Sequence, residues 1–158
     1  MSDSRRPHWV LAGTWAIVAL ACLTALAGCG SSEDGEGGAQ LTHAQVVKEG
    51  DVICARTSAT ASKELSARLK ELPQGLTPKV EEDLILTVTV PAIEGMAADL
   101  AQIESRPEDE QKLKAISAAF TAAVAKIKKN PVAGIQNDPY AKASGLADTF
   151  GFIECSKY

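Results

Sequence analysis

The sequence predicts an all-α fold: an antiparallel up-down four-helix bundle behind a flexible N-terminal tether. Apolar residues recur every three or four positions through most of the 118 residues from Leu41 to Tyr158, which is the period of helices buried along one side. Prolines and capping residues interrupt this pattern at the expected ends of four segments. Short connections between consecutive amphipathic helices favour antiparallel neighbours.

The N-terminal segment has the layout of an export signal. Nineteen uncharged residues, from Trp9 to Ala27, come shortly after the basic pair Arg5 and Arg6, and Gly28 and Cys29 follow directly. A short basic region before an apolar stretch is typical of a secretory signal. A run of this length is also long enough to span a bilayer as a permanent helix. The small residues and the cysteine at its end favour processing.

The tetrapeptide Leu26-Ala27-Gly28-Cys29 resembles the lipobox of bacterial lipoproteins. That resemblance implies a signal peptide of residues 1–28, cleavage before Cys29 and a diacylglyceryl thioether on its sulfur. Two acyl chains hold a protein firmly, because each buried CH₂ contributes ~0.8 kcal/mol. We therefore expect the protein at the extracytoplasmic face of the cell membrane. The alternative is an ordinary cleaved signal with a chance cysteine.

Residues 29–40 form the expected tether. After Cys29 they consist mainly of glycine, serine and acid, without a large hydrophobic side chain. Such a segment cannot bury enough apolar surface to order itself. As a flexible linker it would span about 17–20 Å on average. The folded domain is then residues 41–158.

The first predicted helix begins at a capping box. Thr42 and Gln45 stand at the two positions of that motif, and Leu41 can pack on Val46. Apolar and small residues then continue at helical spacing until Pro73-Gln74-Gly75 ends the helix. This stripe comprises Val46, Gly50, Ile53, Thr57, Ala61, Leu65, Leu69 and Leu72.

The second predicted helix begins at Thr77-Pro78 and carries its acidic residues in the first turns. A conflict arises at residues 84–90, because LILTVTV favours a strand and Pro91 breaks an ideal helix. An isolated strand has no obvious partner in this chain. We therefore predict a helix with a kink near Pro91.

Two more helices follow. The third begins at Pro107, has acids in its first turn and lysines in its last, and stops at Asn130. A loop over residues 131–137 precedes a short fourth helix that starts near Asp138-Pro139 and ends at Phe150. Gly151 is suited to a left-handed C-terminal cap.

The cysteines predict one disulfide. If Cys29 carries lipid and Cys22 leaves with the signal, only Cys54 and Cys155 remain. An even number of cysteines in an oxidising compartment favours a bond between them. The alternative is two small buried apolar side chains.

Three segments are similar to a group of small exported actinobacterial proteins. They are the opening VVKEGDVICA at residues 46–55, the VPAIE stretch at residues 90–94 and the ending FGFIEC at residues 150–155. The resemblance implies an exported helical domain with a cysteine pair. It implies no catalytic residues.

Composition argues against several classes of function. Loss of the signal leaves 14 basic and 19 acidic residues without a sustained basic block, so nucleic-acid binding is not expected. His43 is the only histidine of the mature chain, which favours no metal site and no cofactor. The acidic runs at residues 81–83 and 108–110, and Lys126, Lys128 and Lys129, are explained by helix dipoles. A weaker alternative is that these lysines contact anionic lipid headgroups. We expect no enzymatic activity.

Two functions of different class remain. The first is an envelope interaction or accessory protein that binds a membrane or wall partner through a helix face, with Ile85 and Ile93 as the candidate contact residues and Val90 and Ile135 beside them. The second is a carrier or sensor for a small hydrophobic ligand, which requires a pocket near Met96 and Phe120 of ~300 Å³ or more. The sequence favours the first.

Overall fold

The structure is a computed structural model that describes residues 40–72 and 75–158. The expected signal peptide, Cys29 and nearly all of the tether lie outside the described residues. The described part is all-α, as predicted: it contains no strand, and Leu41 and Ser105 form an isolated bridge.

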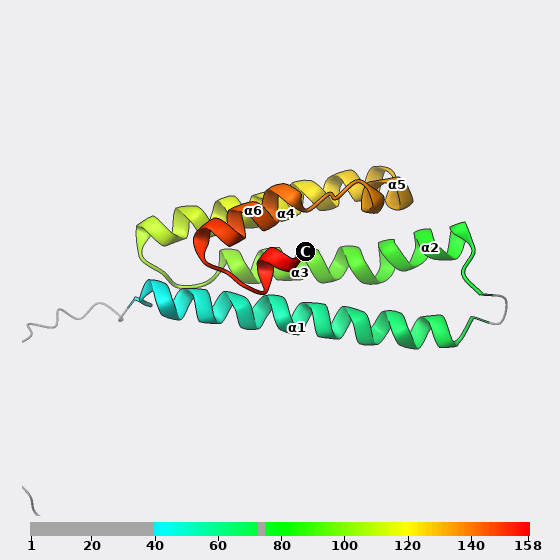
Figure 1. The fold of residues 1–158 in the computed structure, drawn as a ribbon, viewed down its shortest axis with the longest axis horizontal. Helices are drawn as coiled ribbons and strands as arrows, with labels where there is room; N and C mark the ends of the chain where they lie inside the picture. The colour runs from blue at the N-terminus through cyan, green and yellow to red at the C-terminus, as the bar shows by residue number, and fades with distance from the viewer. Residues whose placement is uncertain (1–39, 73–74) are drawn as a thin grey trace, which may run out of the picture. The chain divides into compact units, whose positions relative to one another are not determined.

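Six α-helices and two shorter helical segments make up this part of the chain. The chain reverses direction after α1 and again after α3, so that α1, the helix from α2 to α3, and α4 lie side by side (Figure 1). The elements are α1 (His43–Lys70), α2 (Pro78–Leu84), a π-helix (Ile85–Thr89), α3 (Val90–Ala101), α4 (Pro107–Lys129), α5 (Pro131–Gln136), α6 (Ala141–Phe150) and a 3₁₀ turn (Cys155–Lys157).

Helix α1 forms from the predicted capping box but is buried over only part of its length. Thr42 accepts from the backbone N–H of Gln45 as its N-cap, and the Gln45 side chain accepts in return from the Thr42 backbone. The buried residues of α1 all lie between Val46 and Cys54. Farther along, the residues of the predicted stripe are half-buried and then exposed, and the exposed fraction of Leu69 is 42 %. Helix α6 and the C-terminal segment cover only the first half of α1 (Figure 1), which is why the stripe loses its cover.

The conflict around Pro91 is resolved by a π-helix, and the strand alternative does not form. Residues 78–101 are helical throughout, with a π-helix at Ile85–Thr89. Within it the backbone N–H of Val90 donates to the carbonyl of Ile85. Pro91 has no N–H to donate and its ring crowds the preceding turn. The wider turn accommodates this residue within a continuous helix.

The predicted loop at residues 131–137 is wrong over most of its length, because α5 occupies Pro131–Gln136. Pro131 stops α4 and also starts α5, since proline is well suited to the first position of a helix. Gly134 lets α5 approach α4 closely: a Cβ there would lie 2.8 Å from the Cα of Ile127. Beyond α6, Gly151 has the predicted left-handed conformation, with φ at 106°.

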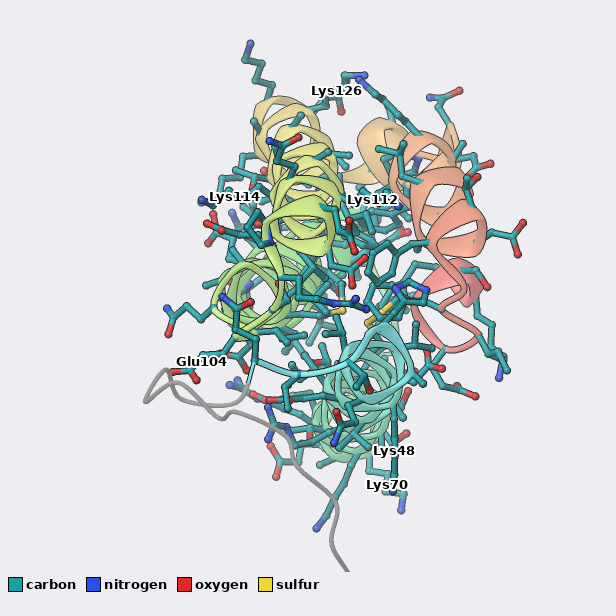
Figure 2. The ribbon with its side chains drawn as sticks, turned by 90° about the vertical axis from the view of Figure 1, so that its left-hand side faces the viewer. Lys48, Lys70, Glu104, Lys112, Lys114 and Lys126 are labelled. Carbon is teal, nitrogen blue, oxygen red and sulfur yellow. A yellow bond between two sulfur atoms is a disulfide. The ribbon has the colours of Figure 1, made fainter. Side chains whose placement is uncertain are left out.

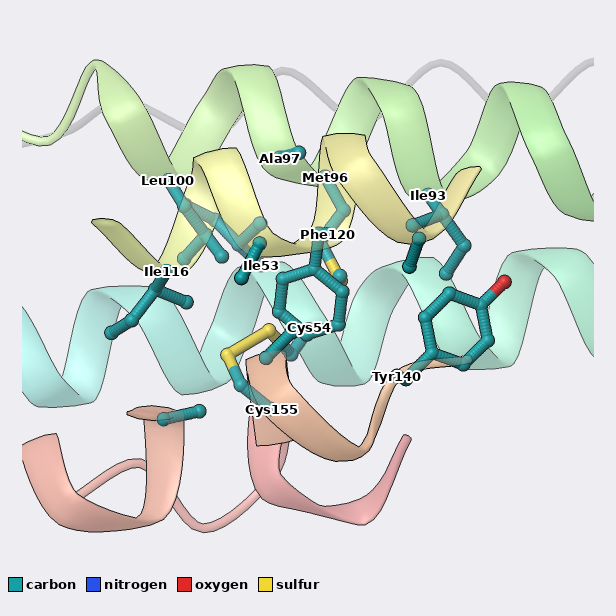
Figure 3. Close-up of a cluster of buried hydrophobic side chains, with 14 of the residues drawn as sticks. Ile53, Cys54, Ile93, Met96, Ala97, Leu100, Ile116, Phe120, Tyr140 and Cys155 are labelled. Carbon is teal, nitrogen blue, oxygen red and sulfur yellow. A yellow bond between two sulfur atoms is a disulfide. The ribbon is translucent and has the colours of Figure 1, made fainter. Parts of the chain in front are cut away.

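The core lies between α1, α3, α4 and α6, and its largest fully buried side chains are Phe120, Phe152 and Met96 (Figure 3). The helix Pro78–Ala101 is long and apolar enough to cross a membrane by length and composition. Its Met96 and Leu100 are buried against the other helices. Burial in a protein core accounts for the same composition.

Replacing Gly50 tests the contact between α1 and the C-terminal segment. A Cβ at Gly50 would lie 2.3 Å from the ring of Phe152, which is 1 % exposed and has no room to move. We expect Gly50→Ala to lower the free energy of unfolding by about 1–3 kcal/mol in urea titrations. The control is Gly95→Ala, where nothing lies within 4 Å; that change should stabilise the helix by about 0.5–1 kcal/mol. Equal effects of the two variants would contradict the close packing.

Candidate functional site

The expected disulfide between Cys54 and Cys155 is present. Both cysteines are fully buried, and their Cα atoms are 5.2 Å apart, within the usual range for a disulfide. Figure 3 shows the bond beside Phe120 and Ile53, between α1 and the C-terminal segment. The bond therefore closes a span of 101 residues at the centre of the core.

Polar contacts hold the same C-terminal segment on α1. The carboxylate of Asp51 accepts from the backbone N–H groups of Ile153 and Glu154, at 3.2 and 2.7 Å. The hydroxyl of Tyr158 donates to the carbonyl of Cys54 at 2.9 Å. Together with the disulfide, these bonds attach residues 151–158 to α1; we call this attachment the C-terminal clamp.

Aromatic side chains pack behind the clamp. The ring of Phe120 lies 6.1 Å from that of Tyr140 and 5.7 Å from that of Tyr158, measured between centroids. Burial raises the pKa of both tyrosines to about 12, so both are neutral phenols at physiological pH. The Tyr140 hydroxyl is buried without a hydrogen-bond partner in the described part of the chain.

A second polar contact lies where the tether would enter the domain. His43 Nδ1 is 3.0 Å from Oδ1 of Asp109, and the His43 ring packs edge-on against Phe150 with centroids 4.8 Å apart. The Asp109 side chain is only 4 % exposed, whereas that of His43 is 45 % exposed. Next to them, Leu41 forms its bridge with Ser105. We call this group, residues 41–43 with Ser105 and Asp109, the tether junction.

Sequence reasoning missed the tether junction. It placed His43 in the first turn of a helix as an ordinary polar residue, and explained Asp109 by the dipole of the helix that begins at Pro107. Asp109 does lie in the first turn of α4, but it is buried and faces α1. The two residues are 66 positions apart, and only the fold brings them together. Their signal in the sequence was a single histidine at the second position of a capping box.

The other candidate polar residues stay apart from one another. The described part of the chain contains no group of three or more side chains that could hold a metal ion. Glu110 pairs with Lys114, and Lys128 with Glu94 at 2.6 Å. Lys126 borders a surface hollow of about 510 Å³ between α4, α5 and α6. These residues are surface charges of ordinary helices.

Ile85 and Ile93 do not form an exposed contact face. They are 7 % and 3 % exposed and belong to the core, as does Val90 at 2 %. The expectation placed them outside the apolar stripe because it counted regular α-helical spacing on both sides of the kink expected near Pro91. The π-helix changes the angular position of the residues around it. Ile135 is half-buried against the core.

The residues expected to line a ligand pocket are also in the core. Met96 is 1 % exposed and Phe120 is fully buried, and Figure 3 shows both among neighbouring aliphatic side chains. The larger hollows of the described part lie on the surface and are lined by other residues.

No protein-family model matches the chain, and no curated protein or solved structure shows significant similarity to it.

Removing the disulfide tests how much the domain depends on the C-terminal clamp. The double variant Cys54→Ala/Cys155→Ala should lose about 4–5 kcal/mol of unfolding free energy, because its unfolded chain is no longer restricted by a long closed loop. Urea titrations of the wild type with and without reductant provide the control. Reductant should lower the wild type to the level of the variant and leave the variant unchanged. A wild type insensitive to reductant would contradict the bond.

Removing the imidazole tests the tether junction. In His43→Ala the Asp109 carboxylate stays buried but loses its hydrogen-bond partner, and leaving such a group unsatisfied costs about 1–3 kcal/mol. We expect the lower half of this range, because His43 is half exposed to solvent. The measurement is a double-mutant cycle with Asp109→Asn in urea. Additive effects of the two substitutions would show that the residues do not interact.

Proposed function

We propose that this protein is a membrane-anchored extracytoplasmic lipoprotein whose helical domain serves as an envelope interaction or accessory protein. The observation that carries the proposal is the tetrapeptide ending at Cys29, placed between an uncharged run and a Gly/Ser-rich segment. Lipid on Cys29 would attach the domain to the membrane through the tether of residues 29–40.

The disulfide supports export. Bonds of this kind persist in oxidising compartments and are rare in the cytosol. Cys54 and Cys155 are joined across the core, so the domain is suited to the outside of the cell membrane.

The arrangement of the helices fits an up-down four-helix bundle with an incomplete fourth position. In this description α1, the α2–α3 helix and α4 are three members, and α5 with α6 supplies a divided fourth one. We also propose kinship with the small exported actinobacterial proteins that the sequence resembles. This kinship brings no catalytic residue, and we assign the domain no enzymatic role.

Binding to another envelope component accounts for the structure better than carriage of a ligand. The side chains that would line an internal pocket, Met96 and Phe120, fill the core instead. A bundle with a filled core interacts through its surface. The exposed large hydrophobic side chains of the described part are Val52, Leu69, Leu76 and Ile153.

Changing Cys29 to serine tests the anchor. We expect wild-type protein in the membrane fraction, with the mass of a diacylglyceryl group on the peptide that begins at Cys29. The Cys29→Ser variant should lack this mass and leave the membrane after cleavage of its signal or remain unprocessed. Fractionation followed by mass spectrometry gives both readings. A wild-type protein without lipid mass would refute the proposal.

A further inference from the structure

The side of α1 that is turned away from the core has an unusual composition. It carries three lysines and three small or apolar residues at spacings of three, four or seven positions, which places them on one side of the helix. All are exposed. This surface, which we call the α1 outer face, consists of Lys48, Val52, Ala55, Ala59, Lys63 and Lys70.

The charge of this face is opposite to that of the chain, whose formal net charge is −4. None of the ion pairs formed within the described residues involves Lys48, Lys63 or Lys70. In Figure 2, Lys48 and Lys70 extend from the same side of α1, and Lys126 lies on the far side of the molecule. The three lysine charges are therefore available to an external anion.

Acidic residues border the face, and three of them have partners within the domain. Asp51 accepts from the two backbone N–H groups of the C-terminal clamp. Asp99 pairs with Arg56 at 2.9 Å. Glu49 lies toward α3, where it borders a hollow together with Arg56. Glu154 lines the same hollow as Lys48 and pairs with Lys157.

The face also offers apolar contact. Val52 is 57 % exposed, and Ile153, beside Asp51, is 65 % exposed. A shallow hollow of about 480 Å³ next to them is lined partly by Ala44, Val47 and Ala55. Cationic and apolar groups on one helix side match the interface of an anionic lipid bilayer, which attracts lysine and accepts small apolar groups.

We propose that the α1 outer face lies on the anionic phospholipid surface to which the protein is anchored, with α1 parallel to the membrane. This inference rests on the proposed function, because the tether enters at His43, the first residue of α1. A tether of about 17–20 Å keeps the near end of the face within reach of the bilayer. Lys48 and Lys70 are ~33 Å apart along the helix, so only a helix lying flat brings both within ~10 Å of the lipid charges.

Tryptophan fluorescence can locate the face at the bilayer. Both native tryptophans, Trp9 and Trp15, belong to the expected signal peptide, so the mature chain has none. Full-length lipoprotein purified from membranes is reconstituted into phosphatidylcholine vesicles containing brominated lipid, with or without about one quarter phosphatidylglycerol. The reporters are Ala59→Trp on the α1 outer face and Ala122→Trp on the exposed side of α4. We expect stronger quenching of the Ala59→Trp variant, only with phosphatidylglycerol and only at low salt.

Charge variants supply the second reading. The variant Lys48→Gln/Lys63→Gln/Lys70→Gln should lose the quenching difference. The control Lys126→Gln/Lys129→Gln/Lys142→Gln removes the same number of exposed charges elsewhere and should keep it. For the mature chain that begins at residue 29 and carries Cys29→Ser, prepared without the expected signal peptide, vesicle co-sedimentation should weaken by about fivefold for each α1 lysine removed, and roughly a hundredfold for all three.

The lipid mass on Cys29 separates the two proposals. If lipid is present and the two reporters are quenched equally, the inference is overturned and the proposed function stands. If lipid is absent, the proposed function fails, and the co-sedimentation of the same chain decides the inference. Equal vesicle binding by the two lysine variants would overturn it in either case.

Discussion

The attachment of residues 151–158 to the first half of α1 is the constraint on which the rest of the structure depends. Three residues within five positions of α1 each contact a different part of the segment: Gly50, Asp51 and Cys54. The missing side chain of Gly50 leaves space for the Phe152 ring, Asp51 binds two backbone N–H groups, and Cys54 forms the disulfide. Because α6 and α4 pack behind this segment, its attachment also fixes their distance from α1.

This arrangement explains why a helix of 28 residues is buried only between Val46 and Cys54. The C-terminal segment contacts α1 between Gly50 and Cys54, where the Tyr158 hydroxyl donates to the carbonyl of Cys54. On the side of α1 that faces the helix from α2 to α3, the contacts come from α3 and the π-helix. The remaining surface of α1 is free of packing constraints and can carry lysine, serine and alanine at little cost in stability.

The local parts of the fold were predictable from the sequence, and the long-range parts were not. Thr42 and Gly151 act within one turn of their own helix, so their type identifies its ends. The pairing of Cys54 with Cys155 followed from counting. The π-helix before Pro91 and the helix after Pro131 arise from how proline is accommodated in a packed chain, which periodicity does not describe. The burial of Ile85 and Ile93 and the contact between His43 and Asp109 depend on which helices become neighbours, and one sequence does not determine that.

The tether junction and the α1 outer face share α1, because His43 of the junction is the first residue of the helix that carries the face. Leu41 is fixed by Ser105 and His43 by Asp109, so the chain enters α1 at a defined point of the domain. Lys48 follows within two turns of that point on the same helix. In the lipoprotein that we propose, a pull on the tether would reach α1 at the end where the lysine-bearing face begins. A protein of net negative charge is repelled by anionic lipid in most orientations. In the lipoprotein that we propose, the anchored segment would lead into the end of α1 that carries Lys48, so attraction and attachment would favour the same orientation.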